Sequence, residues 1–142
     1  MNLLDVNVLI ALFRGESAHH STAMAWWSQA DAIGAPFTVT DPVWASFVRV
    51  VTNPRAFDVP ATFDEAWAFV GTIRSQPTYR RYLDAFEPLH EFERLCRGTN
   101  ATGILVTDAY IAACASAIGA TVVTFDRDFR KFDGLRVLEL SV

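Results

Sequence analysis

Residues 105–132, LVTDAYIAACASAIGATVVTFDRDFRKF, decide the fold, because they contain in succession a helix, a tight turn, a buried strand and a short helix. Asp108 can begin an alanine-rich helix over Ala109–Ile118, which a glycine ends. Thr121–Phe125 is short, β-branched and apolar, as in a strand of a parallel sheet, and it stops at Asp126. Strand C-termini and helix N-termini face the same, ligand-binding edge of an open α/β sheet. Asp108 and Asp126 are therefore expected to face one cleft.

A third carboxylate follows the first strand of the chain. Leu3 begins an apolar strand, Asp5 interrupts it, and Asn7 can cap an apolar helix over Val8–Phe13. A charge beside a buried strand is costly unless it is paired or bound to a metal, and the first basic residue of this segment is Arg14. We therefore interpret Asp5 as a ligand.

Two of these aspartates also have a purely structural interpretation. Asp is common at helix N-caps, so Asp108 and Asp126 can serve as caps, the latter for a turn over Arg127–Lys131. Three carboxylates that converge from separate strands, however, concentrate too much negative charge to stand without cations. Hard oxygen ligands at this density suit Mg²⁺ or Mn²⁺. Asp5, Asp108 and Asp126 are therefore predicted to share a metal site, with Asp128 as a further ligand.

Three segments resemble the acidic motifs of PIN-domain ribonucleases, specifically the VapC-type toxins of toxin-antitoxin pairs. They are LLDVNVLIAL at residues 3–12, TDAYIAACA at 107–115 and TVVTFDRDF at 121–129. VWASFVRVVTNPRAF, residues 43–57, also resembles a segment of one branch of those toxins. The order and spacing of these segments, rather than any one of them, make the resemblance specific, and it spans the whole chain.

The resemblance implies a magnesium- or manganese-dependent endoribonuclease with catalytic residues Asp5, Asp108 and Asp126. It implies cleavage of RNA of the translation machinery, tRNA or rRNA, by metal-activated water, which leaves a 5′-phosphate and a 3′-hydroxyl. It further implies a cognate antitoxin, and together with the apolar excess of the chain it favours a homodimer. The implied fold is a three-layer α/β/α sandwich around a mainly parallel sheet of about five strands, as the alternation of strands and helices also predicts.

The chain departs from the family at one position. Many PIN domains carry a further Glu on the helix after the second strand, and here Val43–Phe47 contains no acid. Asp41, one turn earlier, and Ser46 are the candidates to replace it, although Asp41 is also read as the cap of its helix. A catalytically impaired PIN-like binding module is therefore one alternative function. A magnesium-dependent phosphatase is another, but its second Asp would stand where Asn7 does.

Composition limits the remaining possibilities. The 142 residues, 51% of them hydrophobic, predict one domain over residues 1–142 with a substantial core. A net charge of -4 disfavours nonspecific coating of nucleic acid, although Arg127, Arg130 and Lys131 form a local basic rim beside the predicted site. No apolar stretch is long enough to span a bilayer, so a soluble, cytoplasmic protein without a membrane partner is expected. Cys96 and Cys114 are expected to be buried free thiols.

The rest of the chain is predicted from capping signals and apolar periodicity. Helices are expected over residues 18–31 with Ser17 as cap, from 41 to 53, from Thr62 to Arg74 with a capping box formed by Glu65, and from Pro88 to Gly98. Strands are expected over Phe37–Thr40, Tyr79–Phe86 and Arg136–Leu140.

Overall fold

Strands and helices alternate along the chain in the computed structural model, which describes residues 1–83 and 87–141. In chain order the elements are β1 (Asn2–Leu4), α1 (Val6–Phe13), α2 (His20–Ala32), β2 (Phe37–Thr38), α3 (Asp41–Val51), α4 (Phe63–Arg74), α5 (Leu89–Thr99), α6 (Ile104–Ala117), β3 (Thr121–Thr124), the 3₁₀ helix η1 (Arg127–Lys131) and β4 (Val137–Glu139).

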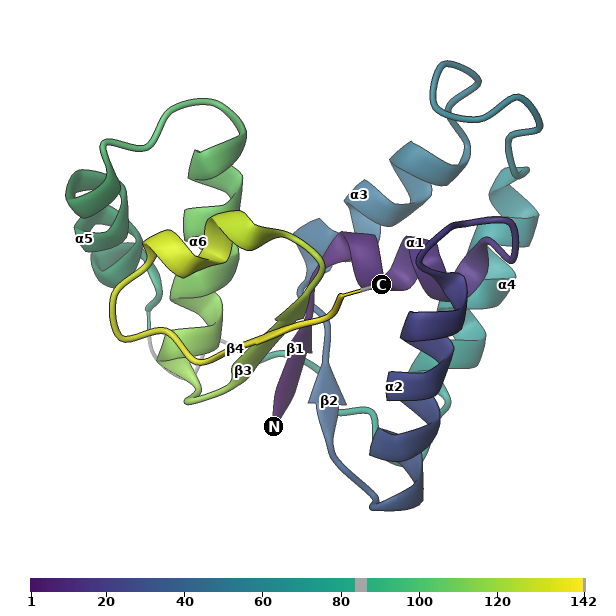
Figure 1. The fold of residues 1–142 in the computed structure, drawn as a ribbon, viewed down its shortest axis with the longest axis horizontal. Coiled ribbons are helices and arrows are strands. Elements are labelled where there is room, and N and C mark those ends of the chain that lie inside the picture. Colours follow the sequence, from purple (N-terminus) through teal and green to yellow (C-terminus); the bar gives the residue numbers. More distant parts are fainter. Residues whose placement is uncertain (84–86, 142) are drawn as a thin grey trace.

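The described strands form one parallel sheet in the order β2-β1-β3-β4. Helices α5 and α6 lie to one side of this sheet and α1 to α4 to the other, which confirms the predicted three-layer α/β sandwich (Figure 1). Side chains of β1 and β3 that are fully buried, Leu3, Leu4, Val122 and Val123, join Phe47 of α3 and Phe129 of η1 in the core. Burial of these strands on both faces explains why their central residues are apolar in succession rather than alternating with polar ones.

The sheet has four strands among the described residues, where about five were expected. The strand expected over Tyr79–Phe86 is reduced to a single parallel bridge between Tyr79 and Phe37. Residues 80–83 form no strand, and residues 84–86 lie outside the described part. The neighbouring strand β2 explains this result, because it is only two residues long. Phe37 N donates to Thr78 O and Phe37 O accepts from Arg80 N, so few backbone groups of β2 remain to pair with a longer strand.

Several helices begin at residues other than those predicted. Helix α6 begins at Ile104, about one turn before the expected start, so Asp108 lies inside the helix and is not its cap. Helix α1 is capped by Asp5, whose side chain accepts from Val6 N, and Asn7 lies within the helix. The N-cap of α3 is Thr40, which makes Asp41 the first helical residue.

Of three further capping predictions, two are confirmed and the third is wrong. Thr62 and Glu65 form the expected capping box at the start of α4, and Asp126 caps η1 through Asp128 N. Helix α2 begins at His20, whereas Ser17 was predicted to cap a helix from residue 18. The Ser17 hydroxyl instead accepts from the backbone N of His19 in the preceding turn.

Neither cysteine forms a disulfide, as predicted, but only one of them is buried. Cys114 is buried in α6, while Cys96 on α5 is half-buried. Among the described residues, no helix combines the length and apolar character needed to cross a membrane.

Candidate metal centre

The carboxyl ends of β1 and β3 meet where the connections of the sheet change direction. From β1 the chain moves to β2 on one side, and later elements return to β3 on the other side. Leu4 pairs with Val123 in this register, and Asp5 N donates to Val123 O at 3.0 Å. Asp5 and Asp126 therefore follow neighbouring strands at the switch point of an open α/β sheet, the usual ligand-binding position of such folds.

Three carboxylates converge beside this point. Asp108 comes from the second turn of α6, and Asp126 and Asp128 come from the cap and first turn of η1. One carboxylate oxygen of each lies within 4.8 Å of those of the other two. Asp108 is buried, and Asp126 and Asp128 are half-buried. Helix α6 and η1 pack against each other, so residues about twenty positions apart meet here.

Asp5 lies outside this group of three but is held next to it. Its Oδ1 accepts from Val6 N at 2.7 Å, and its Oδ2 accepts from Thr124 Oγ1 at 2.7 Å and Asn7 Nδ2 at 3.1 Å. The side chain is only 3% exposed. These neutral donors fix the orientation of the Asp5 carboxylate without cancelling its charge. The structure thus brings Asp108, Asp126 and Asp128 together and places Asp5 behind them as a buried neighbour.

Asn7 and Thr124 form a polar connection that the sequence interpretation did not identify. Thr124 Oγ1 accepts from Asp126 N at 2.9 Å and from Asn7 Nδ2 at 3.2 Å, in addition to donating to Asp5. Asn7 Oδ1 accepts from Phe125 N at 3.2 Å. The available signal was Thr124, a hydroxyl residue that ends the strand two positions before Asp126. This network ties the positions of Asp5 and Asp126 to each other.

The electrostatics show a concentration of negative charge with little compensation. Burial, followed by repulsion from Asp5, Asp126 and Asp128, raises the pKa of Asp108 to about 7. Burial also raises the pKa of Asp5, and repulsion from Asp126 adds to this effect, against the opposing hydrogen bonds from Thr124, Val6 and Asn7. The positive charge of Lys131 lowers the pKa of Asp108, but this effect is smaller than burial and the repulsion from the other carboxylates.

The residues present fit a hard divalent cation. Oδ2 of Asp108 is buried and has no hydrogen-bond partner among the described residues. A buried carboxylate oxygen in that condition is costly unless a cation neutralises it. Carboxylate oxygens that converge within a few ångströms are the donor set that Mg²⁺ and Mn²⁺ take.

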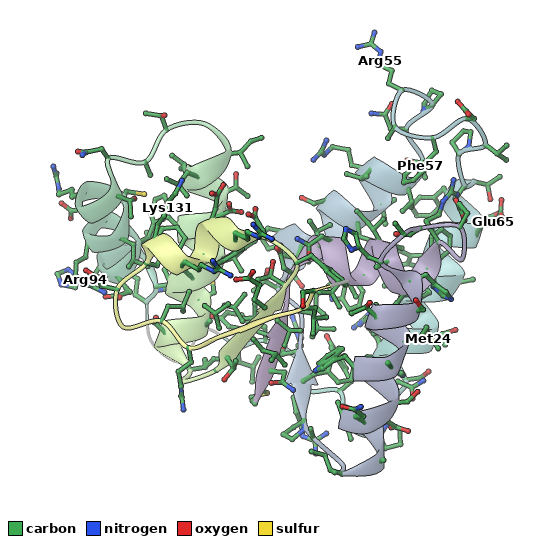
Figure 2. All side chains as sticks on the ribbon, in the orientation of Figure 1. Met24, Arg55, Phe57, Glu65, Arg94 and Lys131 are labelled. Atoms are coloured by element: carbon green, nitrogen blue, oxygen red, sulfur yellow. The ribbon has the colours of Figure 1, made fainter. Side chains whose placement is uncertain are left out.

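The expected basic rim beside the site is largely neutralised by ion pairs. Arg130 Nε lies 2.7 Å and Arg127 Nε 3.8 Å from carboxylate oxygens of Glu139. Lys131 Nζ lies 3.1 Å from Asp128 Oδ1, and Figure 2 shows Lys131 on η1. These side chains remain exposed, but their charge is shared with acids of η1 and β4.

The two candidates for the missing helix acid are placed differently. Ser46 is half-buried in the middle of α3 and makes no side-chain hydrogen bond to the described residues. Asp41 is exposed and lines a groove between α3 and α4. Neither belongs to the group of three carboxylates.

Comparisons with a family model and with individual proteins point to the same family. The PIN domain family matches residues 3–135. Ribonuclease VapC31 of Mycobacterium tuberculosis is 40% identical over 136 residues, which cover 96% of each chain.

Two solved structures share the fold at low identity. VapBC2 from Rickettsia felis, bound to a DNA fragment from its promoter, superposes with a TM-score of 0.74 at 13% identity, over 99% of this chain and 98% of that chain. VapC20 of Mycobacterium tuberculosis, a toxin that cleaves the sarcin-ricin loop, has a TM-score of 0.68 at 20% identity, over 96% and 99% of the two chains. Both lie below 25% identity and so support the fold alone.

Proposed function

This chain belongs to the PIN domain family, among its VapC ribonucleases, and from that premise we propose that it is the magnesium-dependent toxin of a toxin-antitoxin pair and cleaves RNA of the translation machinery. Manganese is the alternative ion. The observation that carries the proposal is the convergence of Asp108, Asp126 and Asp128 beside buried Asp5.

We assign the metal to Asp108, Asp126 and Asp128, with Asp5 as the fourth acid of the site. A divalent ion bound there supplies activation of water and neutralisation of the charge that develops on a phosphodiester during hydrolysis. Thr124 and Asn7 hold the Asp5 carboxylate in one orientation and join it to Asp126 N. Asp108 contributes a buried oxygen whose negative charge the protein itself does not balance.

The site can be tested by replacing Asp126 with Asn. The variant keeps the shape of the side chain and its capping oxygen, and we expect it to remain folded and to lose Mg²⁺-dependent cleavage of total RNA. Wild-type protein in EDTA should be equally inactive, and added Mg²⁺ or Mn²⁺ should restore only the wild type. Cleavage by Asp126→Asn at the wild-type rate would place the active site elsewhere.

The substrate can be identified by mapping new RNA ends after brief expression in cells. Hydrolysis by activated water leaves 5′-phosphate ends that ligate directly to an adaptor. Ends concentrated in tRNA or rRNA would support a target in the translation machinery. Ends spread over messenger RNA in proportion to its abundance would contradict that part of the proposal, while leaving the ribonuclease activity intact.

The assembly of the protein is part of the same proposal. We propose that residues 1–142 act as one cytoplasmic domain that forms a homodimer and binds an antitoxin. The family match over residues 3–135 and the resemblance to toxin-antitoxin proteins support it. Sedimentation of the purified chain, alone and with the product of the adjacent gene, tests both interactions. A monomer with no affinity for that product would contradict them.

A further inference from the structure

Helices α3 and α4 enclose an open groove of about 710 Å³ that the proposed chemistry does not use. Its lining includes four aromatic residues, which are Trp44 on α3, Phe63 and Trp67 on α4, and Tyr79 after α4. Phe63 is 58% exposed and Trp67 is 50% exposed. Large aromatic side chains are expensive to leave in water, so their exposure in one groove points to a ligand.

The two exposed rings are stacked on each other and leave their outer faces open. The ring centroids of Phe63 and Trp67 are 5.7 Å apart with an interplanar angle of 14°, so the rings are nearly parallel. Trp44 lies deeper, and its indole N–H has no acceptor among the described residues. The groove therefore offers aromatic faces for stacking and an unpaired hydrogen-bond donor.

Three arginines surround the aromatic residues. Arg49, Arg74 and Arg81 line the groove, and no described residue forms an ion pair or a hydrogen bond with the guanidinium group of any of them. One acid, Asp41, lines the same groove. The basic residues of η1, in contrast, are paired with Glu139 and Asp128. The groove thus carries a local positive charge on a chain whose net charge is -4.

We propose that this groove binds a single-stranded segment of the RNA substrate, with bases stacked on Phe63 and Trp67 and phosphates paired with Arg49, Arg74 and Arg81. This inference rests on the proposed ribonuclease function. A single strand supplies both the flat bases and the negative charge that the groove matches. An acidic peptide supplies charge without flat rings, and the bases of a duplex are stacked inside it and cannot reach the two side chains.

The groove continues toward the helix that carries Asp108. Asp41 and Arg81 also line a second cavity of about 250 Å³, which is bounded on its other side by Tyr110 and Cys114 of α6. A strand bound along α3 and α4 can therefore extend past the start of α3 to α6. The groove would select RNA by its single-stranded character, and the metal centre would cut it.

Binding of a fluorescein-labelled oligouridylate in EDTA tests the inference without cleavage. Arg74→Gln should weaken binding and lower the steepness of the salt dependence by about 0.7 in log Kd against log salt, the value per phosphate contact of a single strand. Trp67→Ala should weaken binding by about tenfold with the same salt dependence as wild type, while Trp67→Phe should retain most of the affinity. Both positions are exposed, so the variants are expected to fold.

Arg55→Gln is the matched control. Arg55 lies at the tip of the loop between α3 and α4, away from the body of the protein (Figure 2), and it does not line the groove. Its replacement removes one positive charge and should leave affinity and salt dependence near wild type. Equal losses in Arg55→Gln and Arg74→Gln would show a general charge effect and overturn the inference.

Two further outcomes separate the inference from the proposed function. If Arg74→Gln and Trp67→Ala bind RNA normally while Asp126→Asn loses cleavage, the groove inference fails and the ribonuclease proposal stands. If the groove variants instead disrupt self-association or antitoxin binding with RNA affinity unchanged, the groove is a protein interface and the inference also fails. Groove-dependent RNA binding without Mg²⁺-dependent cleavage would support RNA binding and reject the nuclease proposal.

Discussion

Replacement of Asp108 with Asn should stabilise the metal-free protein at alkaline pH while it abolishes metal-dependent cleavage. The pKa of Asp108 is raised from 3.8 to about 7, chiefly by burial and then by Asp5, Asp126 and Asp128. A pKa raised from 3.8 to about 7 corresponds to about 4 kcal/mol of unfavourable charge on Asp108 in the folded state. Solvent reaches the half-exposed carboxylates of the cluster and screens their repulsion, so we reduce this value to about 2 kcal/mol.

The direction of the pH dependence follows from the raised pKa. The folded protein holds the Asp108 proton more tightly than the unfolded chain, so protonation stabilises the fold. That stabilisation is complete below about pH 4 and is lost as pH rises through about 7. Asn is neutral at every pH, so Asp108→Asn cannot lose stability in this way as the pH rises.

Urea denaturation in EDTA at about pH 4 and about pH 8 measures this effect. At the lower pH the two proteins should be similarly stable, and at the higher pH Asp108→Asn should exceed wild type by about 2 kcal/mol, or about 6 °C in Tm. Mg²⁺ should stabilise wild type more than the variant at the higher pH. Asp58→Asn, an exposed change in the loop between α3 and α4, serves as control and should behave as wild type.

Equal stability of wild type and Asp108→Asn at about pH 8 would refute the electrostatic reasoning. It would mean that the Asp108 charge is already compensated within the protein. Cleavage activity in Asp108→Asn at the wild-type level would separately remove Asp108 from the metal site.

Three other changes test the surroundings of the site. Thr124→Val removes the hydroxyl that donates to Asp5 and accepts from Asp126 N, and urea denaturation should show a loss of about 1 to 3 kcal/mol together with reduced cleavage. Ser46→Glu should tighten Mg²⁺ binding in calorimetric titration if α3 presents this position to the carboxylate cluster. An unchanged affinity would favour Asp41 as the residue that replaces the missing helix acid. Thr62→Ala breaks the capping box of α4 and should cost about 1 kcal/mol with cleavage unaffected.

The sequence predicted β1 and β3, and the acids that follow them, because those signals are local. A short β-branched run that ends in an aspartate identifies both the strand and the edge where the carboxylate lies, as for Thr121–Thr124 and Asp126. The capping box of Thr62 and Glu65 is equally local. The predicted start of α6 was wrong because residues 104–107 carry no strong helix signal. Asp108 therefore resembled a helix cap more than a residue in the interior of a helix.

The ion pairs of Arg127 and Arg130 with Glu139 could not be predicted, since they depend on how η1 packs against β4. Arg130 meets Glu139 only because η1 returns beside β4. Arg49 and Arg81 lie 32 positions apart in the sequence and line one groove only after α3 and α4 pack. A count of nearby charges therefore assigned the basic surface to η1, where the charges are paired, and overlooked the groove, where no described acid pairs with the three arginines.

The metal centre depends on the pairing of the first strand with the third. Asp5 is oriented by Thr124, a residue 119 positions away, and Asp5 N is bound to Val123 O in the same ladder. Local bonds from Val6 and Asn7 alone would leave the Asp5 carboxylate without its link to Asp126. Because each ladder bond that joins β1 to β3 also brings Asp5 toward Asp126, the acids are held together only when both ends of the chain have folded onto one sheet. The energy that holds them against their mutual repulsion therefore comes from the buried core of β1 and β3 rather than from the site itself.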